Sequence, residues 1–481
     1  MILSLDIGTL GAKVGLLNED LNLIYQRSQE YKINHPKLGW AEQDPEVWWK
    51  TIKSLLKGLD LREVKAIGIS NTCPSLIAMD EEGKALRPAI LYMDQRSLKQ
   101  AEKIKKKLGL NRIFKVTGNR ISPGTLSLTS LLWIKEEEPE VYKKAKLFVH
   151  ANGYIAFKLT DNAAMDPSNA SLTGLFDIRR IRWSEELVED LDLDLSKLPK
   201  ILWSYERVGY TSKEASRELG INEGIPVIIG AADTACAALG LGLIREGQAF
   251  ETTGTSSVLA FLTNKDNFDI RLLNRCYVKE NLWLFMGAMS TTGAALRWFK
   301  DNFSYKDYKD IDEEAREGSS NNLIFLPYMM GERCPLWDPY ARGVLIGLSL
   351  NHRRGDIARA IMEGVAYGLR NNLEILESLG LEVKEIRVTG AAAKSKIWCE
   401  IKANILKKRI IIPNIKETTL LGVAILALSQ SSSKLESLAD KIYQKGGEII
   451  EPSYLEKYDK YYEIFKESYK SLKKIFRKMV S

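Results

Sequence analysis

Residues 2–20 read ILSLDIGTLGAKVGLLNED, and residues 248–266 read QAFETTGTSSVLAFLTNKD. Aligned end to end, the two stretches place Gly8-Thr9 on Gly254-Thr255, with an apolar, strand-like run on each side of the pair. In both stretches the second run ends at Asn-x-Asp. This repeat of strand, Gly-Thr turn and strand predicts that the chain contains two structurally related halves that face one another.

The two Gly-Thr turns contain the residue types needed to hold phosphate groups. Glycine allows the backbone to approach a ligand closely and tolerates positive φ. Threonine adds a hydroxyl beside exposed backbone N–H groups, so each turn can hold phosphate oxygens or a water bound to Mg²⁺. Two such turns could clamp one nucleotide between two domains.

The stretch 226–257 contains a candidate catalytic carboxylate. Asp233 follows the short apolar run Val227–Ile229, and Ala235–Leu243 is Ala, Gly or Leu at every position but one, which is typical of a tightly packed helix. A carboxylate after a buried strand, followed by the turn at 254–255, suits a base near a phosphate cradle. On this stretch alone, a helix-capping Asp and an ordinary hairpin explain the pattern equally well.

The composition is that of an ordinary globular protein. The 481 residues are 45% apolar and 27% charged, which leaves room for two or three domains with full cores. The net charge of +7 is small against 69 Lys and Arg and 62 Asp and Glu, so it gives no case for nucleic acid.

Cysteine and histidine usage limits the chemistry further. The five cysteines are far apart and form no CxxC, which favours a reduced, cytoplasmic protein over a disulfide framework or a zinc site. Three histidines leave little material for Ser/His/Asp or His–metal catalysis. Because the chain starts directly with a strand, we expect no signal peptide, and no apolar run reaches the length of a membrane helix. We therefore expect no membrane partner.

The first half alternates strands with helices, which predicts an α/β fold built on a doubly wound sheet. We expect a hairpin over 2–24, a helix from 45 to about 59, and strands at 64–70, 76–79 and 90–93. In such sheets, polar residues just past the strand ends are the usual ligand positions. Asn71–Ser75 and Asp94–Arg96 both fit that placement.

Residues 98–225 are more helical and more polar than the first part of the chain. The pattern predicts helices at 98–108 and 127–146 and short strands around 154–178. Asp166–Ser171 is a tight loop, either a ligand loop or a plain Asx/ST turn. The Gly-rich stretch 240–247 is the expected boundary between the halves, and it has the composition of a hinge.

The second half contains a strand-to-helix turn made of small residues. A long amphipathic helix over Arg353–Leu379 precedes a strand at Glu385–Thr389, which enters Gly390–Ala393 and opens a helix from about Ser395. Small residues there leave space over backbone N–H groups for an adenine or a ribose, or serve close helix–strand packing. No GxxxxGK[ST] exists in the chain, which rejects a Walker-type ATPase.

The C-terminal segment combines aromatic residues, from Tyr454 to Phe476, with many lysines. Binding to a membrane surface or to RNA is one interpretation of this composition. The helical spacing of the aromatics favours the simpler alternative, in which the helix docks onto its own domain.

In combination, these motifs resemble those of the FGGY carbohydrate kinases, relatives of actin and hexokinase in fold, and most closely those of the xylulokinase-like branch. The similarity covers essentially the whole chain, and the order of the motifs is specific where each alone is weak. The matching motifs are Asp6–Thr9, Gly39–Pro45, Arg87–Leu91, Asp94–Arg96, Asp166–Ser171, Gly230–Asp233, Thr253–Thr255, Gly331–Arg333 and Gly390.

The resemblance implies a duplicated α/β fold of two actin-like, ribonuclease H-like domains with a cleft between them. Residues 1–243 would form an N-terminal domain with the sugar site and the catalytic Asp, and residues 244–481 a C-terminal, nucleotide-binding domain. The implied reaction is ATP- and Mg²⁺-dependent phosphorylation of a small sugar or polyol, with a ketopentose such as xylulose favoured. Asp233 would accept the proton of the sugar hydroxyl.

The resemblance also implies roles for residues at matching positions. The implied nucleotide contacts are Gly8, Thr9, Lys13, Thr253, Gly254, Thr255, Gly390 and Ala391. The implied substrate contacts are Thr72, Cys73, Asp94, Arg96, Asp166 and Asp233. The implied metal site has Asp6 and Asp233 near Mg²⁺.

The chain departs from the family in two places. After the strand that ends at Ser70, xylulokinases proper carry Met-His-Gly and glycerol kinases an Arg-Glu pair, whereas this chain has Thr72–Ser75, so the sugar stays open. The adenosine loop is usually Gly-Gly-Gly and here is Gly390-Ala391-Ala392. The two added methyl groups narrow that slot, and their effect on nucleotide preference stays open.

Two alternatives to a pentose kinase remain. One is an actin-like nucleotide-binding sensor or assembly protein without sugar kinase activity, which would not need a polar pocket near Cys73, Asp94 and Asp166. The other is a kinase of glycerol, erythritol or a ketohexose. The assembly state, including a homodimer, is open as well.

Overall fold

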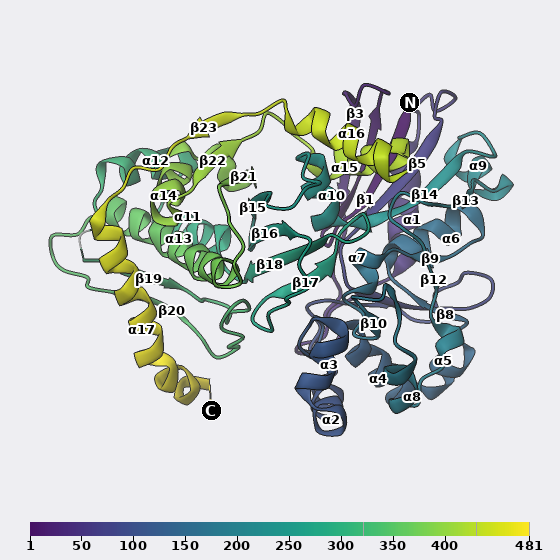
Figure 1. The fold of residues 1–481 in the computed structure, drawn as a ribbon, viewed down its shortest axis with the longest axis horizontal. Coiled ribbons are helices and arrows are strands. Elements are labelled where there is room, and N and C mark those ends of the chain that lie inside the picture. Colours follow the sequence, from purple (N-terminus) through teal and green to yellow (C-terminus); the bar gives the residue numbers. More distant parts are fainter. Residues whose placement is uncertain (321, 430, 481) are drawn as a thin grey trace. The chain divides into compact units, whose positions relative to one another are not determined.

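The computed structural model describes residues 1–320, 322–429 and 431–480 and contains two compact units (Figure 1). The first unit comprises Met1–Ile244, Asn274–Trp283 and Ile415–Gln444, and the second comprises Arg245–Leu273, Leu284–Asn414 and the chain from Lys445 onward. The boundary at Ile244 lies within the stretch 240–247, but two later segments return to the first unit. The continuous domains 1–243 and 244–481 and a hinge between them stay predictions.

The first unit is organised around a mixed six-stranded sheet. Its strands, in spatial order, are β13 (Arg207–Tyr210), β14 (Pro226–Ala232), β5 (Ala66–Asn71), β1 (Ile2–Ile7), β2 (Gly11–Leu17) and β3 (Leu23–Glu30). β5 runs parallel to both β14 and β1, whereas β2 is antiparallel to β1 and β3. The carboxyl ends of β1, β5 and β14 therefore lie at one edge of the sheet.

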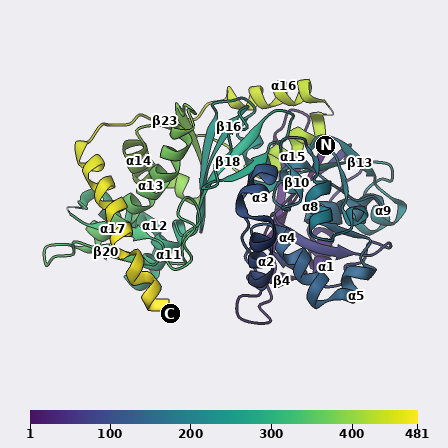
Figure 2. The same cartoon turned by 60° about the horizontal axis from the view of Figure 1, so that its bottom comes forward.

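The second unit contains strands in the same order, and those from β23 to β16 also have the same relative directions. From one side to the other they are β23 (Glu448–Ile450), β22 (Arg409–Ile412), β21 (Glu385–Gly390), β15 (Ala249–Thr253), β16 (Ser257–Thr263) and β18 (Trp283–Met289). β21 is parallel to β22 and β15, and β15 and β16 form an antiparallel hairpin; β16 and β18 lie side by side (Figure 2). The repeat in the sequence thus corresponds to the hairpins β1–β2 and β15–β16, and the two related halves are confirmed.

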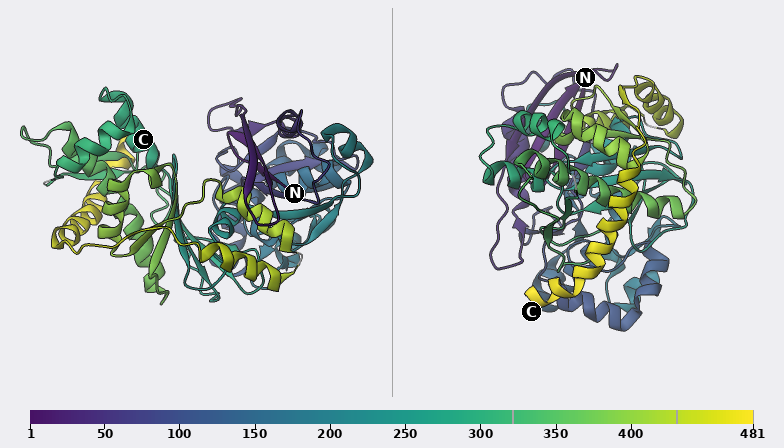
Figure 3. Two further views of the ribbon diagram at one scale, coloured as in Figure 1. Left: turned by 90° about the horizontal axis from the view of Figure 1, so that it is seen from above. Right: turned by 90° about the vertical axis from the view of Figure 1, so that its left-hand side faces the viewer.

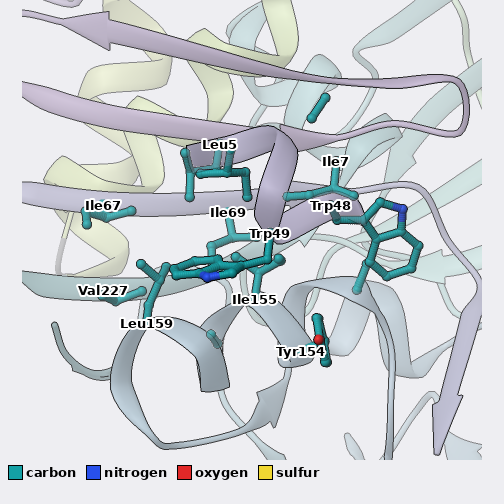
Figure 4. Packing of buried hydrophobic residues seen from close by; sticks show 14 of the residues in the cluster. Leu5, Ile7, Trp48, Trp49, Ile67, Ile69, Tyr154, Ile155, Leu159 and Val227 are labelled. Atoms are coloured by element: carbon teal, nitrogen blue, oxygen red, sulfur yellow. The ribbon is translucent and has the colours of Figure 1, made fainter. Parts of the chain in front are cut away.

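Alternating side chains of the first sheet build the core of the first unit (Figure 4). In a strand, every second residue faces the same side. The side chains from β1, β5 and β14 pack against residues of α1 (Pro45–Leu56) and α6 (Ala151–Thr160); the labelled set is Leu5, Ile7, Ile67, Ile69, Val227, Trp48, Trp49, Tyr154, Ile155 and Leu159. Asp44 caps α1 by accepting a hydrogen bond from the Glu46 N–H at 3.0 Å.

The remaining elements of the first unit lie around this sheet. Its other helices are α2 (Leu98–Leu108), α3 (Leu110–Thr117), α4 (Ser127–Glu137), α5 (Pro139–Lys144), α7 (Pro167–Ala170), α8 (Glu185–Asp190), α9 (Lys213–Leu219), α10 (Asp233–Gly240), α15 (Thr418–Ser429) and α16 (Ser432–Tyr443). A second sheet has the order β4 (Glu42–Gln43), β7 (Ala89–Leu91), β6 (Ser75–Met79) and β8 (Leu147–Val149). Short pairs join β9 (Ala164–Met165) to β12 (Lys200–Ile201) and β10 (Phe176–Asp177) to β11 (Arg182–Trp183).

Two expectations for residues 98–225 need correction. The region 154–178 contains short strands, as expected, at Ala164–Met165 and Phe176–Asp177, but it also contains α7 and most of α6, which the pattern did not predict. α6 is buried on nearly every side, so its sequence lacks the polar face that signals a helix. The helix expected over 127–146 is two helices, because Pro139 removes a backbone N–H donor and begins α5.

Two glycines allow α15 to pack closely on α10. A Cβ added at Gly422 would lie 1.9 Å from the carbonyl oxygen of Cys236, and one added at Gly240 would lie 1.8 Å from that of Thr418. α15 also covers β1, β5 and β14, and the Ser4 hydroxyl donates to the carbonyl of Leu420 at 2.9 Å. This contact explains why the helix after Asp233 contains so many small residues, as its sequence predicted.

Substituting Gly422 by Ala should lower the free energy of unfolding by about 2 kcal/mol, because the new methyl group has no space beside the Cys236 carbonyl. Helix propensity alone would favour Ala by about 1 kcal/mol, so a loss isolates the steric effect. Urea unfolding measures it. Gly254→Ala is a matched stability control, since its Cβ would meet nothing nearer than the Ser256 carbonyl at 3.9 Å. A G422A chain as stable as the original would contradict the close packing.

Helices of the second unit pack on its sheet and on one another. They are α11 (Gly293–Asn302), α12 (Tyr308–Glu317), α13 (Arg354–Ser378), α14 (Lys396–Leu406) and α17 (Glu456–Val480), with a hairpin of β19 (Ile324–Pro327) and β20 (Gly343–Ile346). α17, yellow in Figure 3, contacts α13 and α14. Its buried Tyr462 and Phe465 rings contact Tyr367 of α13, so the docking interpretation of the aromatic residues is confirmed. No helix in the described part of the chain is long and apolar enough to cross a membrane.

Candidate functional site

Several of the polar residues singled out in the sequence lie where the parallel strands of the first unit end. Asp6 lies near the end of β1 and pairs in register with Ser70 of β5, while Asp233 follows β14 directly. Because β1, β5 and β14 are parallel, these strand ends share one edge of the sheet. Two carboxylates therefore lie at the position where such sheets bind ligands.

Asp6 is an acidic group in an unfavourable environment. Its Oδ1 atom is buried and has no hydrogen-bond partner among the described residues. Burial first, and then the negative charge of Asp233, raise the pKa of Asp6 to about 6, against the lowering effects of the Ser70 hydroxyl and of the positive charge of Lys13. An orphaned carboxylate oxygen beside a second carboxylate is suited to binding a cation.

Asp233 is the first residue of α10, and its surroundings hold it in place. Its Oδ1 accepts hydrogen bonds from the backbone N–H of Thr234 at 2.6 Å and from the Thr234 hydroxyl at 3.0 Å. Burial raises the pKa of Asp233, whereas the positive charge of Arg275 and the two Thr234 hydrogen bonds act in the opposite direction. Asp233 can therefore act as a proton acceptor whose basicity is increased by burial.

Asp166 supports the backbone before Asp233. Its carboxylate accepts from the backbone and hydroxyl of Ser168 at 2.9 and 2.5 Å, and Ser168 Oγ accepts in turn from the backbone N–H of Ala232 at 3.0 Å. Three more side chains donate to the same carboxylate: Asn152, Asn169 and Ser204. Asp166 thus caps α7, as the Asx-turn interpretation predicted, and its role as a substrate ligand stays a prediction.

A buried polar network surrounds the loop after β5. Asn169 exchanges side-chain hydrogen bonds with Asn71 at 3.0 and 3.1 Å, and the imidazole of His150 lies 3.4 Å from Asn169 Oδ1. Burial lowers the pKa of His150 to about 4, so the ring is neutral at pH 7. Cys73 Sγ lies 3.6 Å from the same ring, and burial raises the pKa of its thiol, which stays protonated. The Thr72 hydroxyl contacts that of Thr9 at 2.9 Å.

The structure pairs Asp94 and Arg96 with each other. The Arg96 guanidinium donates to Asp94 at 2.9 and 2.7 Å and to Glu42 at 2.6 Å, and both Asp94 and Arg96 side chains are fully buried. Asp94 also accepts from the backbone N–H of Ala41 at 2.6 Å, and the Trp40 ring lies 3.7 Å from the guanidinium. These contacts commit both residues to the local framework, and their contact with substrate stays a prediction.

The first Gly-Thr turn is tightly built. The N–H of Gly8 donates to the carbonyl of Gly11 at 3.0 Å, and Gln43 Nε2 donates to the carbonyl of Thr9 at 2.8 Å. Lys13, which is 46% exposed, forms an ion pair of 2.9 Å with Glu417 at the start of α15. Lys13 can therefore contact a nucleotide only by sharing or leaving this partner.

The second unit gathers five of the residues expected to contact a nucleotide. β15 and β21 pair in parallel with Thr253 opposite Gly390, which places the turn Gly254-Thr255 beside Gly390-Ala391. Gly390 has a φ of 85°, and a Cβ there would lie 2.7 Å from the carbonyl oxygen of Thr253. Gly390 must therefore be glycine. The residues of the two turns, Gly254, Thr255, Gly390 and Ala391, are all exposed, so their backbone groups are accessible to a ligand.

A buried ion pair lies behind this turn. Lys402 Nζ contacts Glu251 at 2.6 Å and the Thr253 hydroxyl at 3.0 Å, and the side chains of Lys402 and Glu251 are each only 1% exposed. The Thr253 hydroxyl also donates to Glu251. Charged hydrogen bonds of this kind fix the end of β15, and with it the start of the turn.

Comparison with known protein families decides the identity of the fold. Residues 1–240 match the N-terminal domain of the FGGY family of carbohydrate kinases, and residues 249–431 match its C-terminal domain. The chain belongs to the FGGY family of carbohydrate kinases. It is accordingly an ATP-dependent phosphotransferase with the actin-like fold of this family, and the resemblance of its motifs is confirmed.

Similar proteins cover almost the entire kinase. A xylulose kinase of Staphylococcus xylosus is 32% identical over 439 residues, which cover 89% of this chain and 90% of that protein. A gluconokinase of Bacillus subtilis is 31% identical and covers 91% of this chain and 88% of its own length. The solved structure of a ligand-bound xylulose kinase from Lactobacillus acidophilus has a TM-score of 0.93 at 25% identity, over 99% of both chains.

Sequence reasoning missed three charged residues of the kinase that lie at these strand ends. Arg275 acts electrostatically on Asp233, Arg297 donates to the Thr255 hydroxyl at 3.1 Å, and Lys402 supports Thr253. None lies in a recognisable motif, and each is separated from the residue it affects by about forty positions or more. Only the folded chain brings them together.

Proposed function

We propose that this kinase transfers the γ-phosphate of ATP in line to a hydroxyl of a small sugar or sugar derivative, with Asp233 as the base. The observation that carries the proposal is the position of Asp233, after a buried strand and beside a second carboxylate at the ligand edge of the sheet. Sequence reasoning favours a ketopentose such as xylulose as acceptor. A sugar acid is the second candidate, because a buried guanidinium, Arg275, lies near Asp233.

The chain's own residues perform the steps around the transfer. Asp233 would orient the acceptor hydroxyl and take its proton late in the reaction, as a carboxylate of raised basicity can do. Phosphoryl transfer needs positioning and charge neutralisation more than covalent chemistry. Thr234 would help by fixing the Asp233 rotamer through its two hydrogen bonds.

The acidic residues fit Mg²⁺, which prefers oxygen ligands and keeps several of its waters. The orphaned Oδ1 of Asp6 and the mutual repulsion of Asp6 and Asp233 are what a bound cation would relieve. When bound, Mg²⁺ would supply neutralisation of phosphate charge. Asp6 would bind the hydrated ion, and Asp233 would contribute its second oxygen.

The nucleotide would contact exposed backbone of the paired turns in the second unit. Gly254 and Thr255, with Thr253 behind them, would bind phosphate oxygens, and Gly390-Ala391 would lie along the adenosine. Arg297, which already donates to Thr255, would add positive charge. Gly8, Thr9 and Lys13 would supply the phosphate contacts of the N-terminal domain.

We also propose that the kinase works in the cytoplasm. All five cysteines are free thiols, and four of them are buried. Free buried thiols are the usual state in a reducing compartment.

ATP consumption across a panel of acceptors tests this function. With Mg²⁺ present, one acceptor among ketopentoses, pentitols, ketohexoses, glycerol and sugar acids should stimulate ATP turnover at least about a hundredfold over a sugar-free control. Substrate-linked turnover is expected because only a bound hydroxyl competes productively with water. ATP hydrolysis that no acceptor changes, or filament formation, would instead support the nucleotide-binding sensor or assembly protein.

A further inference from the structure

Arg275 is a buried cation supplied by a segment that returns to the first unit. It lies in β17 (Leu273–Cys276), between two residues that fix the strand. The N–H of Asn274 donates to Asn119 Oδ1 at 2.9 Å, and the N–H of Cys276 donates to the Ser171 hydroxyl at 2.9 Å. With both neighbours held, Arg275 is only 3% exposed.

Two of the three guanidinium nitrogens of Arg275, Nε and Nη1, are buried without a hydrogen-bond partner among the described residues. No described carboxylate therefore contacts Nε or Nη1. A buried charge without an acceptor costs several kcal/mol, so such groups are normally paired or ligand-binding. Arg275 is therefore incomplete without a further acceptor.

The surroundings of Arg275 are those of the proposed acceptor site. The hydrogen bond from the adjacent Cys276 to Ser171 places Arg275 beside the loop that begins at Asp166. Its positive charge also lowers the pKa of Asp233, Cys73 and His150, in agreement with a position near the proposed base. The acidic groups nearby do not neutralise it by direct contact. Asp166 is occupied by its own hydrogen bonds, and Asp233 bonds to Thr234.

We propose that Arg275 binds a carboxylate of the acceptor, so that the kinase phosphorylates a sugar acid in preference to a neutral ketose. This inference rests on the proposed function and narrows its acceptor. A sugar hydroxyl could accept one hydrogen bond from Arg275 but would leave its charge uncompensated. A carboxylate accepts several N–H bonds at once and neutralises the guanidinium, which makes the pair strong in a buried site.

The fixed charges of the site agree with a single negative charge on the acceptor. Asp6 and Asp233 already repel each other there. A phosphate on the acceptor would bring up to two charges against one guanidinium, so a monoanionic carboxylate is the better match. Sugar phosphates are the second source of an anion, and the experiment below separates them.

The test compares matched acids and neutral sugars on the full chain and on two variants, Arg275→Met and Arg275→Lys. Acceptors are gluconate and a five-carbon aldonate, their alditols, xylulose, and a sugar phosphate. We expect kcat/KM for the acid to exceed that for its alditol at least about a hundredfold, as loss of a buried charge pair predicts.

The variants then test the role of Arg275. In R275M, kcat/KM should fall about a hundredfold on the acid and less than about fivefold on neutral acceptors, and R275K should recover part of the loss. R207M, which removes an exposed guanidinium of the same unit, is the matched control.

Binding is measured separately from turnover. Isothermal titration of the unmodified chain with each acid should show affinity that R275M loses and R207M keeps, whether or not phosphate is transferred. Equal losses on acid and neutral acceptors would show that Arg275 acts only on Asp233, and a preference for xylulose or for the sugar phosphate would equally overturn the proposal. Acid binding with no ATP turnover would instead refute the proposed function alone. If R275M fails to fold, the proposal is tested by two other measurements. These are the preference of the unmodified chain for the acid over its alditol, and the activity of R275K on the acid.

Discussion

Replacing Asp233 by Asn or Ala is expected to lower kcat by at least about a thousandfold while leaving ATP binding intact. Asp233 directly follows β14, in which every residue except Pro226 is buried, and its side chain is held by Thr234, so the substitution removes the base without moving its surroundings. The raised pKa from burial makes it the better proton acceptor, which Asn cannot replace. The nucleotide residues of the second unit are untouched.

A single-turnover assay measures the rate at which the phosphorylated product forms. Calorimetric titration with ATP measures nucleotide binding as the second readout. D233E, which keeps a carboxylate but moves it, should retain more activity than D233N. D192N is the control, because Asp192 has a 95% exposed side chain that pairs with Lys135 and is not among the site residues. An active D233A chain would remove Asp233 from the mechanism.

Asp6→Asn is expected to lower kcat about a hundredfold and to raise the Mg²⁺ concentration needed for half-maximal activity. The reason is the loss of a carboxylate whose Oδ1 has no other partner among the described residues. A Mg²⁺ titration of initial rates measures both quantities. A variant with unchanged Mg²⁺ dependence would place the ion elsewhere.

The same variant should be more stable than the original chain when no metal is present. Burial and Asp233 raise the pKa of Asp6 to about 6 from an ordinary 3.8, so the folded state binds this proton more tightly than the unfolded state. The stability that this tighter proton binding contributes is complete below pH 3.8 and is lost as the pH rises through 6. Urea unfolding at pH 8 should therefore favour D6N by about 2 to 3 kcal/mol, and the difference should shrink towards pH 4. A constant difference at all pH values would contradict the buried-charge account.

The fold was predictable where local patterns decide it. The Gly-Thr repeat indicated the duplicated hairpins because glycine and threonine mark turns whatever the partner strands are. α6 was missed, since a helix buried on nearly all sides around Tyr154 and Ile155 has no polar face to reveal its period. The return of segments 274–283 and 415–444 to the first unit depends on contacts between distant residues, which no local pattern contains.

The site was predictable to a similar extent. Asp6 and Asp233 follow from their position after apolar strands, and the structure brings them to one sheet edge. Asp94 and Arg96 have the same sequence signature but are paired with each other, because a pattern of residue types does not show which charges are already neutralised. Arg275 was missed for the converse reason, since an arginine in a short strand looks ordinary until its partners are found missing.

The first unit contains segments from distant parts of the chain, which has a consequence for how the protein is synthesised. α15 covers β1, β5 and β14, yet it lies at Thr418–Ser429, near the end of the chain. During synthesis the first strands leave the ribosome several hundred residues before the helix that buries their second face. The apolar face of β1, β5 and β14 that α15 covers therefore stays uncovered until translation is almost complete. A gene fragment that stops near residue 243 encodes a first unit without α15, the helix that covers one face of its central sheet.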